Sequence, residues 1–217
     1  MNKISPSPAS SREAWLNAAY DALTEGGVEA IKIMPLAKRL DTARSGFYWH
    51  FKDREALLEA MIRHWEDKNT GNLITRCEAY AETICEAMLN LFDCWLDDEL
   101  FDGRLDLAIR NWARVDQALG ARLAVADGRR MKAVRTMFSR YGFAPEEAEV
   151  RTLTVIYTQI GYLSMNVSED RTLRMSRVRT YIEVFTGCIP TASELARFLA
   201  RHGAGTAPDQ PTSGAPG

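Results

Sequence analysis

The 217-residue sequence predicts an all-α fold with a small N-terminal domain and a larger C-terminal domain. Two observations lead to this fold class. Apolar residues recur at intervals of three and four along most of the chain, which is the spacing of helices with one buried face. Nowhere do polar and apolar residues alternate as they would in a half-buried strand. We expect the first domain to span residues 11–68 and the second to span residues 69–202.

The two ends of the chain carry no helical pattern. Residues 1–10 are rich in Ser and Pro, so we expect a flexible arm there. Residues 203–217 hold four Gly and three Pro and are expected to form a disordered tail.

Composition narrows the classes of function. The formal net charge is -2, whereas an indiscriminate polyanion binder carries a strong basic excess. No apolar run approaches the roughly 18 residues of a membrane span, and the N-terminus has no apolar signal-peptide core, so we expect a cytoplasmic protein. The four cysteines form no C-x-x-C pair and the three histidines are scattered, so we expect reduced thiols, no metal site and no cofactor.

The first helix is indicated by an apolar stripe from Trp15 to Leu23, and Gly26-Gly27 should end it.

Two short helices joined by a tight turn should follow. The first begins near Pro35, because a helix tolerates proline in its first turn, and ends near Leu40. Residues 41–42 make the turn, and Thr42 is placed to cap a helix over residues 43–50.

A fourth helix should start after Asp53, an N-cap residue followed by acids. Gly71 interrupts its pattern, so we place the domain boundary near residues 65–72.

Helices should fill the second domain. Asp116 and Asp170 or Thr172 are start signals, Pro145 is a first-turn proline followed by acids, and Gly142 is a stop signal. The expected helices cover residues 73–100 with a break, 105–115, 117–141, 145–166, 170–186 and 192–201.

The stretch from Ile33 to Leu58 carries most of the chemistry in the sequence. From Lys32 to Arg54, six Lys or Arg residues stand against two acids, a local net charge of +4. Positive charge is therefore concentrated on the expected pair of short helices.

The helix over residues 43–50 has aromatic residues on every side. Phe47 and the nearby Phe51 share one face, which is expected to be buried. Tyr48, Trp49 and His50 are consecutive, so at least two of these rings must face solvent. Exposed aromatic donors next to basic residues suit a phosphate surface, and the layout is typical of a DNA-reading helix-turn-helix. Spacing and charge alone leave a plain three-helix bundle open.

Residues 12–65 resemble the DNA-binding domain of the TetR family of bacterial repressors. The resemblance is carried by Leu36-Ala37, the run Phe47-Tyr48-Trp49-His50-Phe51, Lys52, and the Glu55-x-Leu57-Leu58 opening of the next helix. It implies a helix-turn-helix DNA-binding domain followed by a helical domain for ligand binding and dimerisation. The implied function is a homodimeric repressor that an unidentified small-molecule inducer releases from a palindromic double-stranded DNA operator.

The resemblance also implies which residues touch DNA. Arg44 is suited to guanine O6 and N7, with a phosphate contact as the equal alternative. Lys52 and Arg54 would grip the DNA backbone. The implied contacts are Thr42, Arg44, Ser45, Gly46, Tyr48, Trp49, His50, Lys52 and Arg54.

Three positions depart from the family pattern. Asp41 stands where a turn glycine is common, although Asp tolerates the left-handed geometry. Residues 32–34 lack the usual hydroxyl cap, and Ala43 replaces a frequent Ser. The operator sequence therefore cannot be taken over from relatives.

The helix after Pro145 is apolar on nearly all sides, which indicates burial on more than one side, and the following helix carries an apolar stripe. The resemblance implies a four-helix bundle between two subunits. The alternative is that one of these helices forms the centre of the protomer's own core. The candidate interface residues are Leu153, Ile160, Gly161, Val178, Tyr181, Ile182 and Phe185.

The second domain has more aromatic residues than a small bundle needs, so a ligand pocket is the hypothesis and a filled core the alternative. The candidate lining is Met88, Phe92, Trp95, Trp112, Phe138 and Tyr157, with polar Arg110, Asn111 and Gln159 nearby.

The sequence gives less support to other classes of function. An enzyme built on a helical bundle lacks a metal-ligand spacing and a phosphate loop. A module that binds protein or membrane lacks a long basic amphipathic face. Activation instead of repression stays open.

Overall fold

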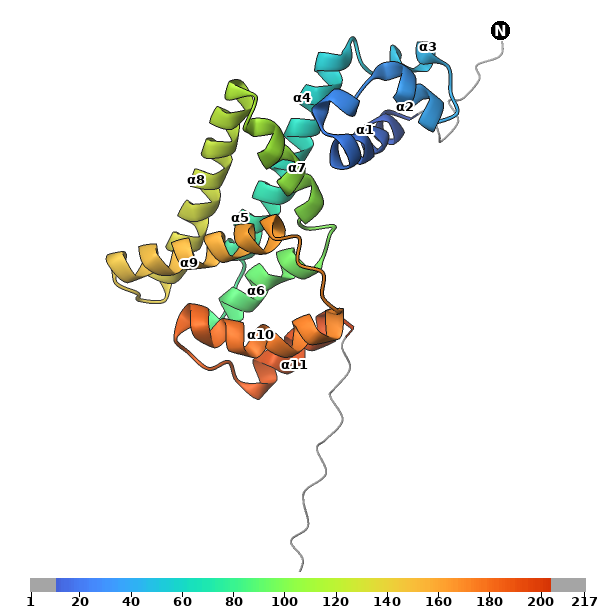
Figure 1. Cartoon of the computed structure of the whole chain (residues 1–217). Helices are drawn as coiled ribbons and strands as arrows, with labels where there is room; N and C mark the ends of the chain where they lie inside the picture. Colours follow the sequence, from blue (N-terminus) through green and yellow to red (C-terminus); the bar gives the residue numbers. More distant parts are fainter. Residues whose placement is uncertain (1–10, 204–217) are drawn as a thin grey trace, which may run out of the picture.

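The computed structural model describes residues 11–203, and within that range it contains helices, turns and bends but no strand. Figure 1 shows α1, α2 and α3 gathered at one end of the molecule, with α4 leading away from them toward the remaining helices. The all-α prediction is confirmed for the described residues. The predicted arm (1–10) and residues 204–217 of the predicted tail lie outside them. No helix of the described range is long and apolar enough to cross a membrane.

The first domain is built on α1 (Arg12–Gly26), η2 (Val28–Ala30), α2 (Ile33–Arg39), α3 (Arg44–Phe47) and α4 (Arg54–Trp65). The side chain of Ser11 caps the start of α1 by accepting a hydrogen bond from a backbone N–H of that helix. Asp53 caps α4 in the same way, as predicted. Trp15 and Phe47 are fully buried at the centre of this domain.

The two short helices differ from the prediction. α2 begins two residues before Pro35, and α3 has four helical residues, after which the chain continues as a turn to His50. Thr42 does not cap α3, because the N-cap residue is Ala43 and no side chain caps that end. The replacement of Ser by Ala at position 43 therefore leaves the helix without a cap hydroxyl.

The predicted break near Gly71 is wrong. α4 continues through a π-helical segment, η3 (Glu66–Gly71), directly into α5 (Asn72–Glu78). Gly71 adopts a right-handed helical conformation with φ -61°. A helix thus runs through the expected domain boundary, and π-helical segments of this kind are frequent at functional sites. The division into residues 11–68 and 69–202 stays a prediction.

Besides α5, the predicted second domain comprises α6 (Ile84–Leu96), α7 (Gly103–Ala113), α8 (Gln117–Arg140), α9 (Pro145–Ser164), α10 (Arg171–Thr186) and α11 (Ala192–Arg201). Asp116 and Asp170 cap their helices and Pro145 begins α9, as predicted. The break expected within residues 73–100 lies at residues 79–83. Gly142 and Gly187 follow α8 and α10 in left-handed conformations that glycine adopts without steric cost.

α7 belongs to the packing of both domains. Its Leu105, Ile109 and Trp112 are buried in the same apolar cluster as Trp15 and Phe47 of the first domain. The second domain has a separate core around α6, α9 and α10. The two predicted domains therefore share one apolar cluster across α7.

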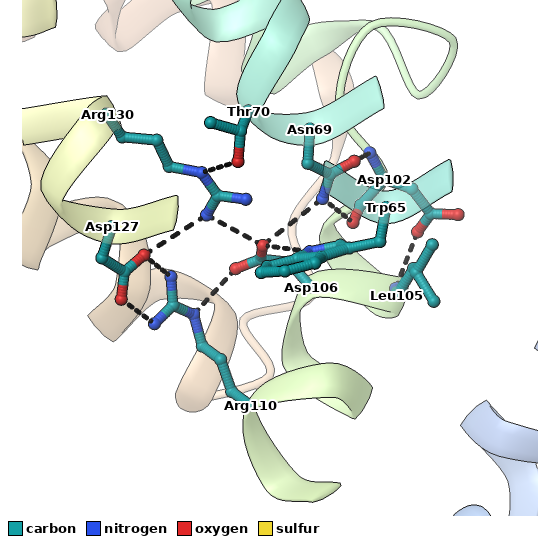
Figure 2. Close-up of polar contacts among 9 residues, drawn as sticks. All are labelled: Trp65, Asn69, Thr70, Asp102, Leu105, Asp106, Arg110, Asp127 and Arg130. Atoms are coloured by element: carbon teal, nitrogen blue, oxygen red, sulfur yellow. Dashed lines mark hydrogen bonds and ion pairs between the residues drawn. The ribbon is translucent and has the colours of Figure 1, made fainter. Parts of the chain in front are cut away.

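A buried polar network centred on Asp106 of α7 joins the two predicted domains (Figure 2). The Asp106 carboxylate is 1% exposed. It accepts hydrogen bonds from Trp65 Nε1 at 2.8 Å, Arg110 Nε at 2.8 Å and Arg130 Nη1 at 2.9 Å. Arg110 in turn forms a bidentate pair with Asp127. Because a buried charge is costly unless it is paired, each member of the network depends on the others.

The π-helical segment is fixed by the same network. Asn69 Nδ2 donates to the carbonyl oxygen of Asp102 at 2.9 Å, and the backbone N–H of Asp102 donates back to Asn69 Oδ1 at 3.0 Å. Thr70 Oγ1 accepts from Arg130 Nε at 2.9 Å. The end of α4 and residues Asn69 and Thr70 of η3 are thus held against α7 and α8.

Burial alone would raise the pKa of Asp106, but the charges of Arg130 and Arg110 and the Trp65 hydrogen bond outweigh it and hold that pKa below its usual value. A carboxylate with a depressed pKa stabilises the fold above its unfolded-state pKa of about 3.9. That contribution is lost as the pH falls through the lowered folded-state pKa.

Replacing Asp106 with Ala should lower the free energy of unfolding by about 3–5 kcal/mol, because Arg110 and Arg130 would share the single carboxylate of Asp127 and the Trp65 indole N–H would lose its acceptor. Chemical denaturation at neutral pH and fixed protein concentration measures this. Glu149→Ala, which removes an exposed ion pair with Arg135, is the control and should cost less than about 1 kcal/mol. Equal losses for the two variants would contradict the assignment of Asp106 as the hub.

Candidate nucleic-acid interface and ligand cavity

The turn between α2 and α3 is made by Asp41 in a left-handed conformation with φ 47°. The sequence-based expectation that Asp would support this geometry is confirmed. Below the turn, Phe47 is fully buried and Phe51 is 5% exposed, and Phe47 packs edge-on against Trp15 at 5.3 Å between ring centroids. These two rings anchor α3 and the following turn to the domain core, as predicted.

The opposite face presents aromatic and basic groups to solvent. Trp49 is 86% exposed and Tyr48 is 48% exposed, while His50 is half-buried. Arg44 Nη2 donates to the Tyr48 hydroxyl at 2.8 Å, and the guanidinium lies 5.6 Å from the centroid of the Tyr48 ring. This contact orders a long cationic side chain on an exposed surface before any ligand arrives.

The remaining predicted contacts lie on the same short segment. Ser45 and Lys52 are exposed, and Thr42 and Gly46 are half-buried. A Cβ added to Gly46 would meet Thr42 Oγ1 at 3.4 Å, so these two residues are packed on each other. The structure therefore brings together the predicted residues from Thr42 to Lys52.

Arg54 is the exception among the predicted DNA contacts. Its Nε donates to the carbonyl oxygen of Ile31 at 2.7 Å, and its Nη2 donates to that of Val28 at 2.8 Å. These bonds tie α4 to the segment between α1 and α2. We therefore assign Arg54 a role in holding the domain together in place of the expected grip on the DNA backbone.

The local positive charge is also smaller than the sequence count indicates. Arg39 is paired with Glu25 at 2.7 Å and with Asp21 at 3.3 Å, both on α1. Lys32 and Lys38, which were not singled out from the sequence, are exposed and make no ion pair within the described residues. A charge count alone cannot separate these lysines from the paired Arg39.

Residues 16–61 match the family model described as bacterial regulatory proteins of the tetR family. The first domain of this chain is therefore similar to that of TetR regulators. The class A tetracycline repressor of transposon 1721 from Escherichia coli is 31% identical over 78 residues, 36% of this chain and 33% of the repressor. The class C tetracycline repressor from Escherichia coli is 38% identical over 61 residues, 28% of this chain and 25% of the repressor. The match thus spans a third or less of these TetR relatives.

Solved structures share the fold over most of the chain. Salmonella enterica GusR has a TM-score of 0.60 at 17% identity, covering 86% of this chain and all of GusR. Mycobacterium smegmatis AmtR has a TM-score of 0.61 at 17% identity, covering 93% of this chain and 97% of AmtR. At this level of identity the likeness shows the fold. The matched family model describes regulatory proteins, which disfavours an enzyme built on the helical bundle.

The predicted ligand-pocket residues do not all line one cavity. Phe92 and Trp95 line a small cavity of about 40 Å³ between α6, α9 and α10. Met88 and Phe138 are fully buried core residues, and Trp112 packs in the first-domain cluster. Tyr157 is 58% exposed. None of these four residues lines the cavity at Trp95, because aromatic content does not distinguish a filled core from a lined cavity.

The sequence singled out one residue of the polar part of this cavity. Gln159, named as a possible orienting residue, lines it, together with Tyr162, Glu169 and Arg174. Arg110 is instead engaged in the buried network, and Asn111 is exposed on α7. Glu169 and Arg174 flank the start of α10, where the sequence shows only a helix cap.

The predicted dimer interface also needs correction. Val178, Ile182 and Phe185 are 2%, 0% and 4% exposed and belong to the protomer's own core. Leu153, Ile160 and Gly161 are half-buried, and Tyr181 is 37% exposed. The exposed apolar residues on α9 and α10 are Val150, Tyr157, Leu173, Tyr181 and Val184.

Replacing Arg44 with Ala should weaken binding to the preferred operator by about 1–3 kcal/mol and relax preference at one base pair, because a bidentate guanidinium contact specifies a base. Competitive binding to a library of single-base operator variants measures this. Tyr48→Phe, which removes the hydroxyl that orients Arg44, should give a smaller change at the same base pair. Uniform weakening across the library would assign Arg44 to phosphate.

Replacing Lys52 with Ala should weaken binding to all operator variants equally, because a phosphate contact carries no sequence information. The slope of log affinity against log salt concentration should become shallower by about one unit. Arg54→Gln is the matched comparison and should lower the melting temperature while leaving the slope unchanged. A changed slope for Arg54→Gln would show that this residue does reach the DNA.

Proposed function

We propose that the protein is a homodimeric, ligand-responsive transcriptional repressor that binds a palindromic DNA operator in the cytoplasm. The observation that carries the proposal is the solvent-exposed Arg44, Tyr48 and Trp49, held in place by the buried Phe47 and Phe51. Adjacent exposed aromatic rings bordered by polar groups are typical of interaction surfaces, and this face combines them with donors for phosphates and base edges.

Sequence-specific binding to DNA through one short helix requires two copies of the protein. One short reading helix reaches few base pairs, whereas a two-fold dimer places two such helices about 34–36 Å apart on successive turns of the major groove. The family model that the first domain matches and the tetracycline repressors that it resembles support repression as the outcome of binding.

The exposed apolar residues of α9 and α10 offer a surface for the second copy. Val150 and Val184 are 58% and 63% exposed and line the same groove between these helices. A Cβ added to Gly161 would meet no atom within 4 Å, so another helix could approach α9 closely there. We infer a four-helix bundle made of α9 and α10 from each subunit.

A ligand would act through the second domain. The cavity at Trp95 is far smaller than the roughly 300 Å³ of an ordinary ligand pocket, so side chains must move for a ligand to enter. The two reading helices of a dimer can have a spacing that fits DNA or one that does not. A ligand that binds more tightly to the second state lowers the affinity for DNA, by as much as its own affinities for the two states differ.

Introducing a charge at the inferred interface should separate the subunits. Val184→Asp is expected to shift the protein from dimer to monomer at micromolar concentration in sedimentation experiments, because a charge buried between apolar helices is costly. Val125→Asp is the control, since Val125 is 66% exposed on α8, away from α9 and α10. A wild-type monomer at this concentration, or a dimer that survives Val184→Asp, would overturn the inferred interface.

A mobility-shift titration with the DNA upstream of the chain's own gene tests the proposed function directly. We expect a salt-dependent complex that Arg44→Ala weakens. Footprinting should reveal two half-sites related by a two-fold axis. No complex at low salt with this DNA or with random-sequence DNA would contradict the proposal.

A further inference from the structure

A second hollow adjoins the small cavity at Trp95. It has a volume of about 200 Å³ and lies between α6, α7 and the end of α9, where Phe101, Tyr162 and Leu163 line it. Trp95, Gln159, Tyr162 and Arg174 line both hollows. Together they form one site with aromatic walls and a polar rim.

The rim of this site carries a cation whose charge no carboxylate neutralises by direct contact. The Arg174 guanidinium lies 4.7 Å from the centroid of the Tyr162 ring and makes no ion pair within residues 11–203. The nearby Glu169 is instead paired with Arg177 at 2.7 Å and accepts from the Tyr162 hydroxyl at 3.2 Å. The positive charge at the rim is therefore available to an anion.

Other charged groups leave the balance positive. Arg104 and Asp98 also line the larger hollow, and neither forms an ion pair within the described part of the chain. Two arginines thus stand against one aspartate there, and Glu169, which lines only the smaller cavity, is already paired. A ligand carboxylate could therefore bind to Arg174 in its ionised form, without taking up a proton.

The aromatic wall supplies one more donor. Trp95 is 9% exposed, and its indole N–H has no hydrogen-bond partner within the described residues. A buried donor without a partner is destabilising, and a hydrogen bond to a ligand oxygen would remove that cost.

We propose that this site binds a small monocarboxylate with an aromatic body, its carboxylate on Arg174 and its ring against Trp95 and Tyr162. The proposal deepens the proposed function by naming the class of ligand, and its regulatory meaning rests on that function. The planar guanidinium of an arginine such as Arg174 can donate two parallel hydrogen bonds to the two oxygens of a carboxylate.

The site is in contact with α7, which packs against the reading head, the part of the first domain that contains α1, α2 and α3. Gly103, the first residue of α7, is packed so closely on Leu163 that an added Cβ would come within 2.6 Å of Leu163 Cδ2. Both residues line the larger hollow. One turn further along α7 lies Asp106, which binds Trp65 at the end of α4. A ligand that moves Leu163 would press on α7 and through Asp106 on α4.

The test uses the full-length protein and three acids of increasing length: benzoate, phenylacetate and 3-phenylpropanoate. Each is compared with its uncharged primary amide by titration calorimetry and ligand-observed NMR. Arg174→Gln removes the charge and keeps much of the side-chain length. Arg179→Gln is the matched control, because Arg179 is exposed on the same helix and lines neither hollow.

We expect at least one acid to bind about ten-fold more tightly than its amide, a preference that Arg174→Gln removes and Arg179→Gln leaves intact. The proposal is overturned if none of the acids binds at about 10 mM, if acid and amide bind equally, or if the two variants weaken the acid alike.

Operator binding, measured separately, distinguishes this proposal from the proposed function. An acid that binds through Arg174 without changing operator affinity supports the site and contradicts the ligand response. DNA binding with no acid bound contradicts the site and leaves DNA recognition intact.

Discussion

The contact between the Asp106 carboxylate and the Trp65 indole is the interaction on which the placement of the reading head depends. Trp65 is the last residue of α4, and α4 continues into the second domain through a π-helical segment. Because the helix is continuous, a rotation of its C-terminal part also turns α4. The hydrogen bond from Trp65 to Asp106 fixes α4 at its last residue. Because Arg110 and Arg130 share the same carboxylate, the orientation of α4 is linked to α7 and α8 at once.

α7 makes this arrangement useful for regulation. Its Ile109 and Trp112 are buried in the apolar cluster of the first domain, its Asp106 holds α4, and its first turn lines the hollow beside Arg174. One short helix therefore touches the apolar cluster of the first domain, the end of α4 and the inferred ligand site. Small displacements at such a helix can be amplified, because packed interfaces switch between discrete arrangements instead of deforming continuously.

The sequence predicted what local patterns determine. The caps at Asp53, Asp116 and Asp170, the left-handed Asp41 and the anchoring pair Phe47 and Phe51 follow from residue type and spacing, and the structure agrees with each. An apolar stripe such as Val178, Ile182 and Phe185 shows that a face is buried but not whether its own core or a partner covers it. Long-range polar contacts leave no periodic signal, so neither the Asp106 network nor the role of Arg54 could be predicted.

The role of Asp106 is tested most directly by the distance between the two reading heads of the proposed dimer. Spin labels at Met34→Cys, in a Cys188→Ser background, report it by double electron–electron resonance, since Met34 is 61% exposed on α2. Trp65→Phe removes the hydrogen bond to Asp106 and keeps an aromatic ring in the core. We predict a narrow distance distribution for the protein with Trp65 and a broader, shifted one for Trp65→Phe. Identical distributions would show that Asp106 does not set the position of the reading heads.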